Sequence, residues 1–455
     1  MVFSSMTFLC CALPLALAVY YLLPRRWRNG WLLAFSLLFY AWGEPVYVVL
    51  MLFSITFNWG AGLALGRTAS KPLRRGLLAA ALAVNLGLLG FFKYAGFLVD
   101  CLNGLTGWRI AFIQPALPIG ISFYTFQALS YVIDVYRDGV PCQRRWSAVA
   151  LYISMFPQLI AGPILRYQEV ARQIEDRRET LSGFAQGLSR FAAGLAKKVL
   201  IANLAAPLAD QAFSLAAPPM AGAWLGAAAY ALQIYFDFSG YSDMAIGLGR
   251  MFGFSYPENF RYPYVSRSVK EFWTRWHISL SGCLRDYLYI PLGGNRVSRG
   301  RQALNLLAVF LVTGLWHGAG WTFILWGLYY GVLRAAQALL PRRSGPVPAL
   351  DWLLTMLLVL VGWVLFRADT LEHALRYLGA MVSGGPGILT RFTPRAGLAL
   401  AAGCLGATPW PRRLFFRLPC RAQAVAQALL VPSALLLCLL TLAAGTYNPF
   451  IYFRF

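Results

Sequence analysis

The sequence predicts an all-α polytopic membrane protein, built as a single integral-membrane domain over residues 1–455. Hydrophobic residues make up 59% of the chain and charged residues 13%, and the mean hydropathy is +0.58, far from an average soluble composition. Apolar runs recur from Val2 to Leu440, and no polar stretch between them is long enough for a soluble domain. We therefore expect about ten to twelve membrane helices, together with short amphipathic and re-entrant helices.

The positive charge of the chain is concentrated in short connectors. Lys and Arg outnumber Asp and Glu by 40 to 17, a net charge of +23 that would also suit a nucleic-acid ligand. The basic residues instead cluster between apolar runs, at residues 25–28, 67–75, 296–301 and 342–343. This positive-inside pattern predicts cytoplasmic connectors, with membrane lipid as a partner and no nucleic acid.

Cysteine and histidine usage gives no indication of a metal or redox site. The eight cysteines are scattered without a CxxC or Cys/His spacing, and three histidines are too few for a multi-histidine metal site. We therefore expect no metal and no tightly bound cofactor. The N-terminal apolar run lacks a basic leader and a convincing cleavage site, so we expect a retained first helix.

Six apolar segments are predicted in the first part of the chain. Two of them form a hairpin around Gly43–Glu44–Pro45, and its first arm is short for a bilayer, which points to local thinning or a re-entrant arm. The sixth contains two prolines and Gly162, which predict a broken helix that lines a cavity or is buried in protein. The segments cover residues 2–23, 31–42, 45–65, 76–92, 118–136 and 148–164.

The second part of the chain alternates apolar segments with one amphipathic region. Between residues 256 and 301, aromatic and apolar positions recur at roughly helical spacing among charged residues, which predicts amphipathic helices at the membrane interface or within the bundle. The apolar segments cover residues 184–204, 221–254, 304–332, 351–366, 396–405 and 424–444, and an amphipathic piece covers 370–381.

Residues 304–332 form the most informative apolar segment. It contains no Asp, Glu, Lys or Arg, and His317 is its only histidine. Gly318 and Gly320 follow at once and interrupt helices, so we expect two half-segments that meet near His317 inside the bilayer. An ionisable group at that depth is costly, which favours a functional role. The alternative is that the neutral imidazole packs among Trp316, Trp321 and Trp326.

Three other polar side chains stand out, and each has a structural interpretation. His277, in RWHISLS, is typical of a satisfied histidine on an amphipathic helix. Asp237 and Asp243 lie in an apolar segment and need partners, with Arg250 or Arg275 as candidates for a structural lock. A second interpretation makes one of these carboxylates orient a histidine. Asn259 stands just outside that segment without an assigned role. His373 also receives no role.

Long ordered strings in the chain resemble the membrane-bound O-acyltransferase (MBOAT) family, in particular its bacterial branch of alginate O-acetyltransferase membrane subunits. The strings are LPIGISFYTFQALSYVIDVYR (117–137), FPQLIAGPILR (156–166), YFDFSGYSDMAIGLGRMFGF (235–254), NFRYPYVSRSVKEFWTRWHISLSGCLRDYLYIPLGGN (259–295), LWHGAGWTFILWG (315–327) and the ending NPFIYFRF (448–455). They extend over nearly the whole chain and are more specific than a short motif. One small departure is SGCLRD, where relatives often carry Thr or Ser and Trp in place of Gly282 and Cys283.

The resemblance implies a fold, a pair of catalytic residues and a set of partners. It implies a helical ring around a thinned centre with a central pocket, and it makes His317 the family's near-invariant histidine and His277 the second. It also implies acetylation of an exported polysaccharide such as alginate, in the bacterial inner membrane. The partners it implies are periplasmic esterase-like acetyltransferase subunits and the polysaccharide export machinery.

Acyl transfer suits this residue set. A thioester is already electrophilic, so catalysis needs a base for the acceptor hydroxyl and donors for the oxyanion. A buried, neutral His317 suits the base, and N–H groups freed by Gly318 and Gly320 are candidate donors. We expect acetyl-CoA as the cytoplasmic donor. Two alternatives remain at this point: D-alanyl transfer to teichoic acid from a carrier protein, and a transporter or flippase with histidine as its proton relay.

Overall fold

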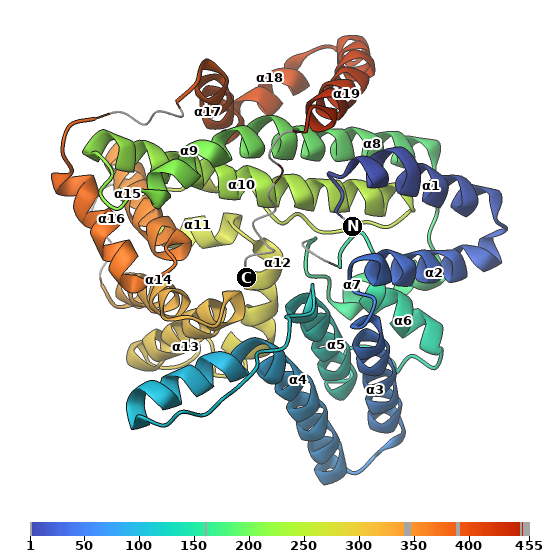
Figure 1. Cartoon of the computed structure of the whole chain (residues 1–455). Coiled ribbons are helices and arrows are strands. Elements are labelled where there is room, and N and C mark those ends of the chain that lie inside the picture. The colour runs from blue at the N-terminus through green and yellow to red at the C-terminus, as the bar shows by residue number, and fades with distance from the viewer. Residues whose placement is uncertain (1, 160–161, 341–346, 388–391, 446–447, 449–455) are drawn as a thin grey trace. The chain divides into compact units, whose positions relative to one another are not determined.

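The regular elements of the chain are helices. A computed structural model describes residues 2–159, 162–340, 347–387, 392–445 and 448, and within these ranges there is no β-strand (Figure 1). The predicted all-α class is confirmed. Two parts of the sequence discussed above, the pair Arg342 and Arg343 and most of the ending NPFIYFRF, lie outside the described residues.

The contacts between residues group the chain into two compact units, and two of the three boundaries between them fall inside helices, one in α8 and one in α10. The first unit comprises Met1–Phe191 and Met244–Pro257, and the second comprises Ala192–Asp243 and Glu258–Phe455. We expect a single integral-membrane domain over residues 1–455. That expectation stays a prediction.

The first unit contains a broken segment where two prolines predict one. Helix α6 ends at Ser154, irregular backbone follows, and α7 begins at Tyr167, so the predicted interruption is present in the described residues around it. The helices of this unit are η1 (Phe8–Ala12), α1 (Leu13–Leu22), α2 (Arg25–Gly43), α3 (Val48–Arg67), α4 (Lys71–Thr106), α5 (Ile121–Tyr136), α6 (Trp146–Ser154), α7 (Tyr167–Glu175) and the start of α8 (Leu181–Ala196).

The second unit combines long helices with the short ones predicted between residues 256 and 301. Its α10 is buried along most of its length. The elements are η2 (Lys197–Ala202), α9 (Asn203–Ser214), most of α10 (Met220–Met251), η3 (Pro263–Val265), α11 (Val269–Arg275), α12 (Ile278–Leu284), η4 (Arg285–Tyr289), α13 (Arg299–His317), α14 (Trp321–Leu339), α15 (Pro348–Arg367), α16 (Leu371–Ser383), α17 (Pro394–Gly406), α18 (Trp410–Arg417) and α19 (Cys420–Ala443).

Five stretches of the described chain are long and apolar enough to cross a membrane. They are Val48–Arg67, Lys71–Thr106, Leu181–Ser214, Pro348–Arg367 and Cys420–Ala443, with Phe8–Leu22 as a shorter apolar helix. Several predicted segments prove longer than their apolar cores: α2 starts at Arg25 where residue 31 was expected, and α4 spans 36 residues. Arg and Lys are good helix formers, so basic residues extend a helix beyond the apolar run that reveals it.

The interruption predicted after His317 is present. Helix α13 ends at His317, and α14 begins at Trp321 after an extended connection. The two helices lie against each other, and small residues allow the close approach: a Cβ atom on Gly314 would overlap the carbonyl oxygen of Phe323, and one on Gly327 would overlap that of Phe310. Close backbone contact of this kind is typical of small residues in membrane helices. It fixes the end of α13, and His317 with it.

Two ion pairs within the second unit join η2 to α10. Lys198 Nζ lies 2.7 Å from Asp237 Oδ1 with both side chains only 2% exposed, and Lys197 Nζ lies 2.6 Å from Asp243 Oδ2. The expected arginine partners of these carboxylates are therefore corrected to lysines. Arg275 pairs with Glu271 instead, at 2.7 Å. The lysines belong to a different helix, 39 and 46 positions away in the sequence, which local spacing does not reveal.

We expect Asp237→Leu to lower the free energy of unfolding by about 3–5 kcal/mol, because it removes the carboxylate facing a buried ammonium group. The double variant Lys198→Met/Asp237→Leu removes both charges and should recover most of that loss. The measurement is thermal unfolding of the purified protein in one detergent. Lys197→Met, at the more exposed pair, serves as the control and should have a smaller effect. A double variant no more stable than Asp237→Leu alone would contradict this account.

Candidate active site

Both candidate histidines belong to the second unit, and both are buried. His317 is the last residue of α13 and is 6% exposed, whereas His277 joins α11 to α12 and is fully buried. The close α13–α14 contact positions His317, and the two short amphipathic helices position His277. Their burial places both imidazoles in surroundings where a proton-accepting nitrogen is sheltered from bulk water.

An aromatic cluster surrounds His317. The ring centroids of Trp316, Trp326 and Phe366 lie 4.8, 5.2 and 5.1 Å from that of His317, in edge-to-face arrangements. These residues come from α13, α14 and α15. The expected packing among tryptophans is therefore confirmed for Trp316 and Trp326. Packing against these rings does not prevent the imidazole from accepting a proton. The structure is therefore consistent both with a packing role and with a chemical role for His317.

Trp316 links the two histidines. Its ring centroid lies 5.8 Å from that of His277 as well as 4.8 Å from that of His317. Phe238 of α10 also contacts the His277 ring, at 4.7 Å. The fold therefore places two histidines that are 40 positions apart in the sequence in contact with the same indole ring.

The backbone at His277 adopts a conformation that is rare for this residue type. Its φ angle is +44° and its ψ angle is +54°, the left-handed region. The neighbouring chain maintains this conformation: the backbone N–H of Ile278 donates to the carbonyl oxygen of Asn259 at 3.0 Å. Strained backbone of this kind is often found at functional sites, where the surroundings enforce it.

Asn259 also binds the His277 side chain. Its Oδ1 lies 3.2 Å from His277 Nδ1, and it accepts hydrogen bonds from the Ser279 backbone N–H at 3.2 Å and the Ser279 hydroxyl at 2.9 Å. Its Nδ2 donates to the hydroxyl of Ser242 in α10 at 3.0 Å. Asn259 is fully buried. One amide therefore ties α10, the loop before α11 and the start of α12 to the imidazole.

This network determines the tautomer of His277. A backbone N–H can only donate, so the atom of Asn259 facing Ser279 must be the acceptor oxygen, and that oxygen also faces His277 Nδ1. The Ser279 hydroxyl lies 3.5 Å from Nδ1 but donates to the same Asn259 oxygen at 2.9 Å, so we assign the proton to Nδ1 and a lone pair to Nε2. Nε2 is buried and has no hydrogen-bond partner among the residues that the structure describes. The arrangement leaves a buried proton-accepting nitrogen on a ring that packs against Phe238 and Trp316.

Burial also affects the protonation of His277. The residue lies outside the five candidate membrane spans, and desolvation by burial lowers its pKa to about 3. Its imidazole is therefore neutral across the physiological range, as a hydrogen-bond acceptor or base requires.

Two expectations about this site need correction. The group that orients a histidine is Asn259, whereas Asp237 and Asp243 pair with lysines. The N–H of Gly318 is not freed by the helix break, because it donates to the carbonyl oxygen of Gly314 at 3.3 Å and ends α13. No periodicity in the sequence indicates that the Asn259 side chain contacts the His277 ring. Its only signal is a polar amide directly after an apolar segment.

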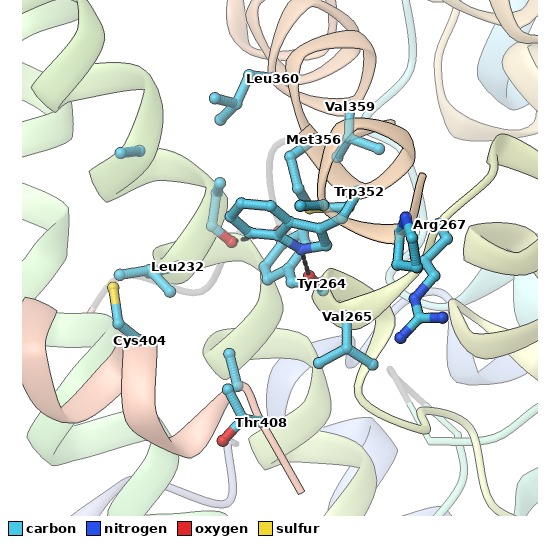
Figure 2. A pocket seen from close by; sticks show the side chains of 15 residues that line it. Leu232, Tyr264, Val265, Arg267, Trp352, Met356, Val359, Leu360, Cys404 and Thr408 are labelled. Carbon is cyan, nitrogen blue, oxygen red and sulfur yellow. Dashed lines mark hydrogen bonds between the residues drawn. The ribbon is translucent and has the colours of Figure 1, made fainter. Parts of the chain in front are cut away.

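An apolar cavity of the same unit contains neither histidine in its lining. It has a volume of about 670 Å³ and lies among α10, α15, α17 and residues 264–267. Figure 2 shows Trp352 among the side chains that line it, with the indole N–H bonded to the carbonyl oxygen of Tyr264. In the described part of the chain, no group of three or more His, Cys, Asp or Glu side chains is placed to hold a metal.

Comparisons with known proteins agree with the resemblance noted in the sequence. The sequence model of MBOAT, the membrane-bound O-acyltransferase family, matches residues 145–366, which include both histidines. The probable alginate O-acetylase of Azotobacter vinelandii is 48% identical over 85% of this chain and 79% of that protein. The probable alginate O-acetylase of Pseudomonas putida is 43% identical over the full length of both chains. The peptidoglycan O-acetyltransferase of Helicobacter pylori is 38% identical over 84% of this chain and 80% of that protein.

A more distant similarity bears on one of the alternatives. The teichoic acid D-alanyltransferase of Streptococcus thermophilus is 32% identical over 47% of this chain and 55% of that protein. The similarity to the acetylating relatives is both higher and more extensive than the similarity to this D-alanyltransferase.

The tautomer of His277 can be measured directly, because the chain contains only three histidines. We expect the ¹⁵N spectrum of protein labelled at histidine to show the Nδ1–H form for the signal that disappears in His277→Gln. Asn259→Asp keeps an acceptor beside Nδ1 and should preserve that form, whereas Asn259→Leu removes the acceptor and should shift the signal toward the Nε2–H form. A wild-type His277 with its proton on Nε2 would contradict the network described above.

The low pKa of His277 also predicts a pH dependence of stability. In the unfolded chain this histidine gains a proton near pH 6.5, whereas in the folded chain it stays neutral down to about pH 3. The unfolded state therefore binds more protons in this window, and acidification below pH 6.5 destabilises the fold. We expect the Tm of the wild type to fall more steeply than that of His277→Gln between pH 7.5 and pH 5. Parallel curves for the two proteins would exclude this titration.

Proposed function

Because the chain belongs to the membrane-bound O-acyltransferase family, it is a membrane acyltransferase, and we propose that it takes acetyl from a cytoplasmic donor for O-acetylation of an exported polysaccharide. One observation at the site supports this proposal most directly. Two buried histidines contact the same indole, inside the segment that matches the family, and one of them presents a lone pair at Nε2.

The reaction requires proton transfer more than activation of the acyl group. The hydroxyl oxygen of the acceptor, which belongs either to the sugar or to a partner subunit that completes the transfer, attacks the carbonyl carbon of the donor thioester. The new C–O bond forms, and the C–S bond breaks to release the thiol. A base must accept the hydroxyl proton as the C–O bond forms, and that proton can then pass to the leaving thiolate. We assign His317 as this base.

His277 has a different assignment, which follows from its tautomer. With Nδ1–H held by Asn259, its free nitrogen can accept a hydrogen bond but cannot donate one to an oxyanion. This suits a group that orients the acceptor hydroxyl or shares its proton. Gly318 is excluded as an oxyanion donor because its N–H is used within α13. The N–H of Gly320 makes no hydrogen bond to the described part of the chain, and we propose it as the donor.

Acetyl-CoA is the donor that we propose, as a substrate and not as a resident cofactor. The acceptor class follows from the relatives, whose names describe acetylation of alginate and of peptidoglycan, both polysaccharides. We place the chain in the bacterial inner membrane as a multi-pass protein, with the basic connectors 25–28, 67–75 and 296–301 on the cytoplasmic side. Five candidate spans support this placement.

We also propose that further subunits complete the transfer. Apolar segments recur along the chain and leave no long polar stretch that could hold a polymer. The partners that we propose are therefore periplasmic esterase-like acetyltransferase subunits and the polysaccharide export machinery. D-alanyl transfer to teichoic acid receives less support, because the matching D-alanyltransferase covers about half of this chain. Membership of an acyltransferase family argues against the transporter or flippase alternative.

The decisive variant is His317→Gln, which fills the space within the aromatic cluster but cannot act as a base at neutral pH. We expect its transfer rate to fall to about one hundredth of the wild-type rate or less, because general base catalysis contributes about 10²–10⁴. The assay uses purified protein in proteoliposomes with acetyl-CoA labelled in the acetyl group and an alginate acceptor, with and without a periplasmic extract. Free CoA thiol and labelled polysaccharide ester are both measured.

His373→Gln is the matched control, because this partly exposed histidine lies in α16 away from the two candidates in sequence and should leave the rate unchanged. A His317→Gln rate above about a tenth of the wild type would exclude base catalysis by His317 and move that assignment to His277. Full-rate polysaccharide acetylation without the extract would exclude the partner proposal. Uptake of intact solute without thiol release would contradict acyl transfer.

A further inference from the structure

The apolar cavity described above has no role in the proposed acyl transfer. Its walls are formed by α10, the segment around Tyr264, α15 and α17, all in the second unit (Figure 2). At about 670 Å³ it is far larger than the small voids found in packed protein interiors. The lining includes Leu232, Met356, Val359 and Leu360, so it is mostly hydrocarbon. Apolar cavities of this kind exclude water and bind apolar ligands.

The polar hydrogens in the lining are already used by the protein. The Tyr264 hydroxyl donates to the carbonyl oxygen of Ala231 at 2.6 Å, and the Trp352 indole N–H donates to that of Tyr264 at 2.9 Å. The Thr408 hydroxyl donates to the carbonyl oxygen of Leu405 at 2.7 Å. A sugar ring or a nucleotide base between these apolar walls would lose its hydrogen bonds to water without replacement, which disfavours both as occupants of the apolar part of the cavity.

Arg267 is the exception among the lining residues. It is exposed, and its guanidinium group makes no hydrogen bond or ion pair within the described residues. Its backbone N–H donates to Glu271 Oε2 at 2.9 Å, but that carboxylate is paired with the Arg275 side chain at 2.7 Å. Figure 2 shows the Arg267 side chain beside Val265 and Tyr264. The cavity therefore combines apolar walls with one available positive charge.

The position of the cavity indicates where an apolar occupant would come from. Helix α15 is a candidate membrane span, and most of its apolar residues are not buried within the protein. Its Trp352 is 44% exposed, and Cys404 on the opposite wall is also exposed, so the cavity reaches the protein surface beside that span. Aromatic residues such as Trp are common where a span meets the lipid headgroups.

We propose that this cavity binds an acyl chain of an anionic glycerophospholipid, whose phosphate pairs with Arg267. The apolar walls take the hydrocarbon chain, and the guanidinium group forms charge-assisted hydrogen bonds with the phosphate oxygens at the rim. The site is independent of the acyl-transfer proposal, because neither histidine lines it.

The test measures bound lipid by native mass spectrometry of the full chain released from nanodiscs that contain equal amounts of phosphatidylglycerol and phosphatidylethanolamine. We expect the wild type to retain phosphatidylglycerol preferentially. Arg267→Gln should lower that preference about fivefold, as expected for one basic residue at a membrane surface. Lys270→Gln is the matched control, since Lys270 is a neighbouring exposed cation outside the lining and should have no effect.

A second measurement tests whether the lipid occupies this cavity, and it needs no variant. Cys404 lines the cavity, whereas the exposed Cys420 does not. Added phosphatidylglycerol should slow the reaction of a maleimide with Cys404 in delipidated protein and leave Cys420 unaffected. Equal retention of the two lipids by the wild type would overturn the anionic assignment. Unprotected Cys404, or an unchanged lipid preference in Arg267→Gln, would overturn the site itself.

Discussion

A polar group buried in an apolar interior must find its partner within the chain, and this constraint determines much of the structure. In the first unit, Asn58 and Asn85 exchange hydrogen bonds between α3 and α4 at 3.0 and 2.8 Å. In the second unit, Lys198 and Asp237 join η2 to α10. Unpaired groups of this kind would cost far more than their pairs contribute. The polar residues of the apolar segments therefore fix which helices lie together.

The candidate active site follows from the same constraint. Asn259 meets its hydrogen-bonding needs by contacting α10 and the start of α12 together, and in doing so it sets both the backbone and the tautomer of His277. The glycine contacts between α13 and α14 act on the other side and fix His317 at the end of its helix. Trp316 then contacts both imidazoles. Chemistry at this site depends on backbone positions set by small and polar residues.

Aromatic contacts connect the active site to the apolar cavity. From Tyr264 in the cavity lining, ring contacts run through Trp276, Trp363 and Phe366 to His317, with centroid distances of 6.3, 4.7, 5.8 and 5.1 Å in turn. Rings packed in this way are rigid and fill space efficiently. A lipid chain in the cavity would therefore support the aromatic layer that also surrounds the catalytic histidine, without taking part in the reaction.

The sequence alone determined the class of this protein and the identity of its candidate catalytic residues. Its hydropathy required membrane helices, Gly318 required a break after His317, and its long ordered strings indicated the acyltransferase family. These are properties of consecutive residues. The tertiary structure alone decided that Asn259 orients His277, that lysines neutralise Asp237 and Asp243, and that a lipid-sized cavity lies beside α15. Such contacts join residues up to about 180 positions apart, and hydrophobic periodicity carries no information on which distant side chains meet.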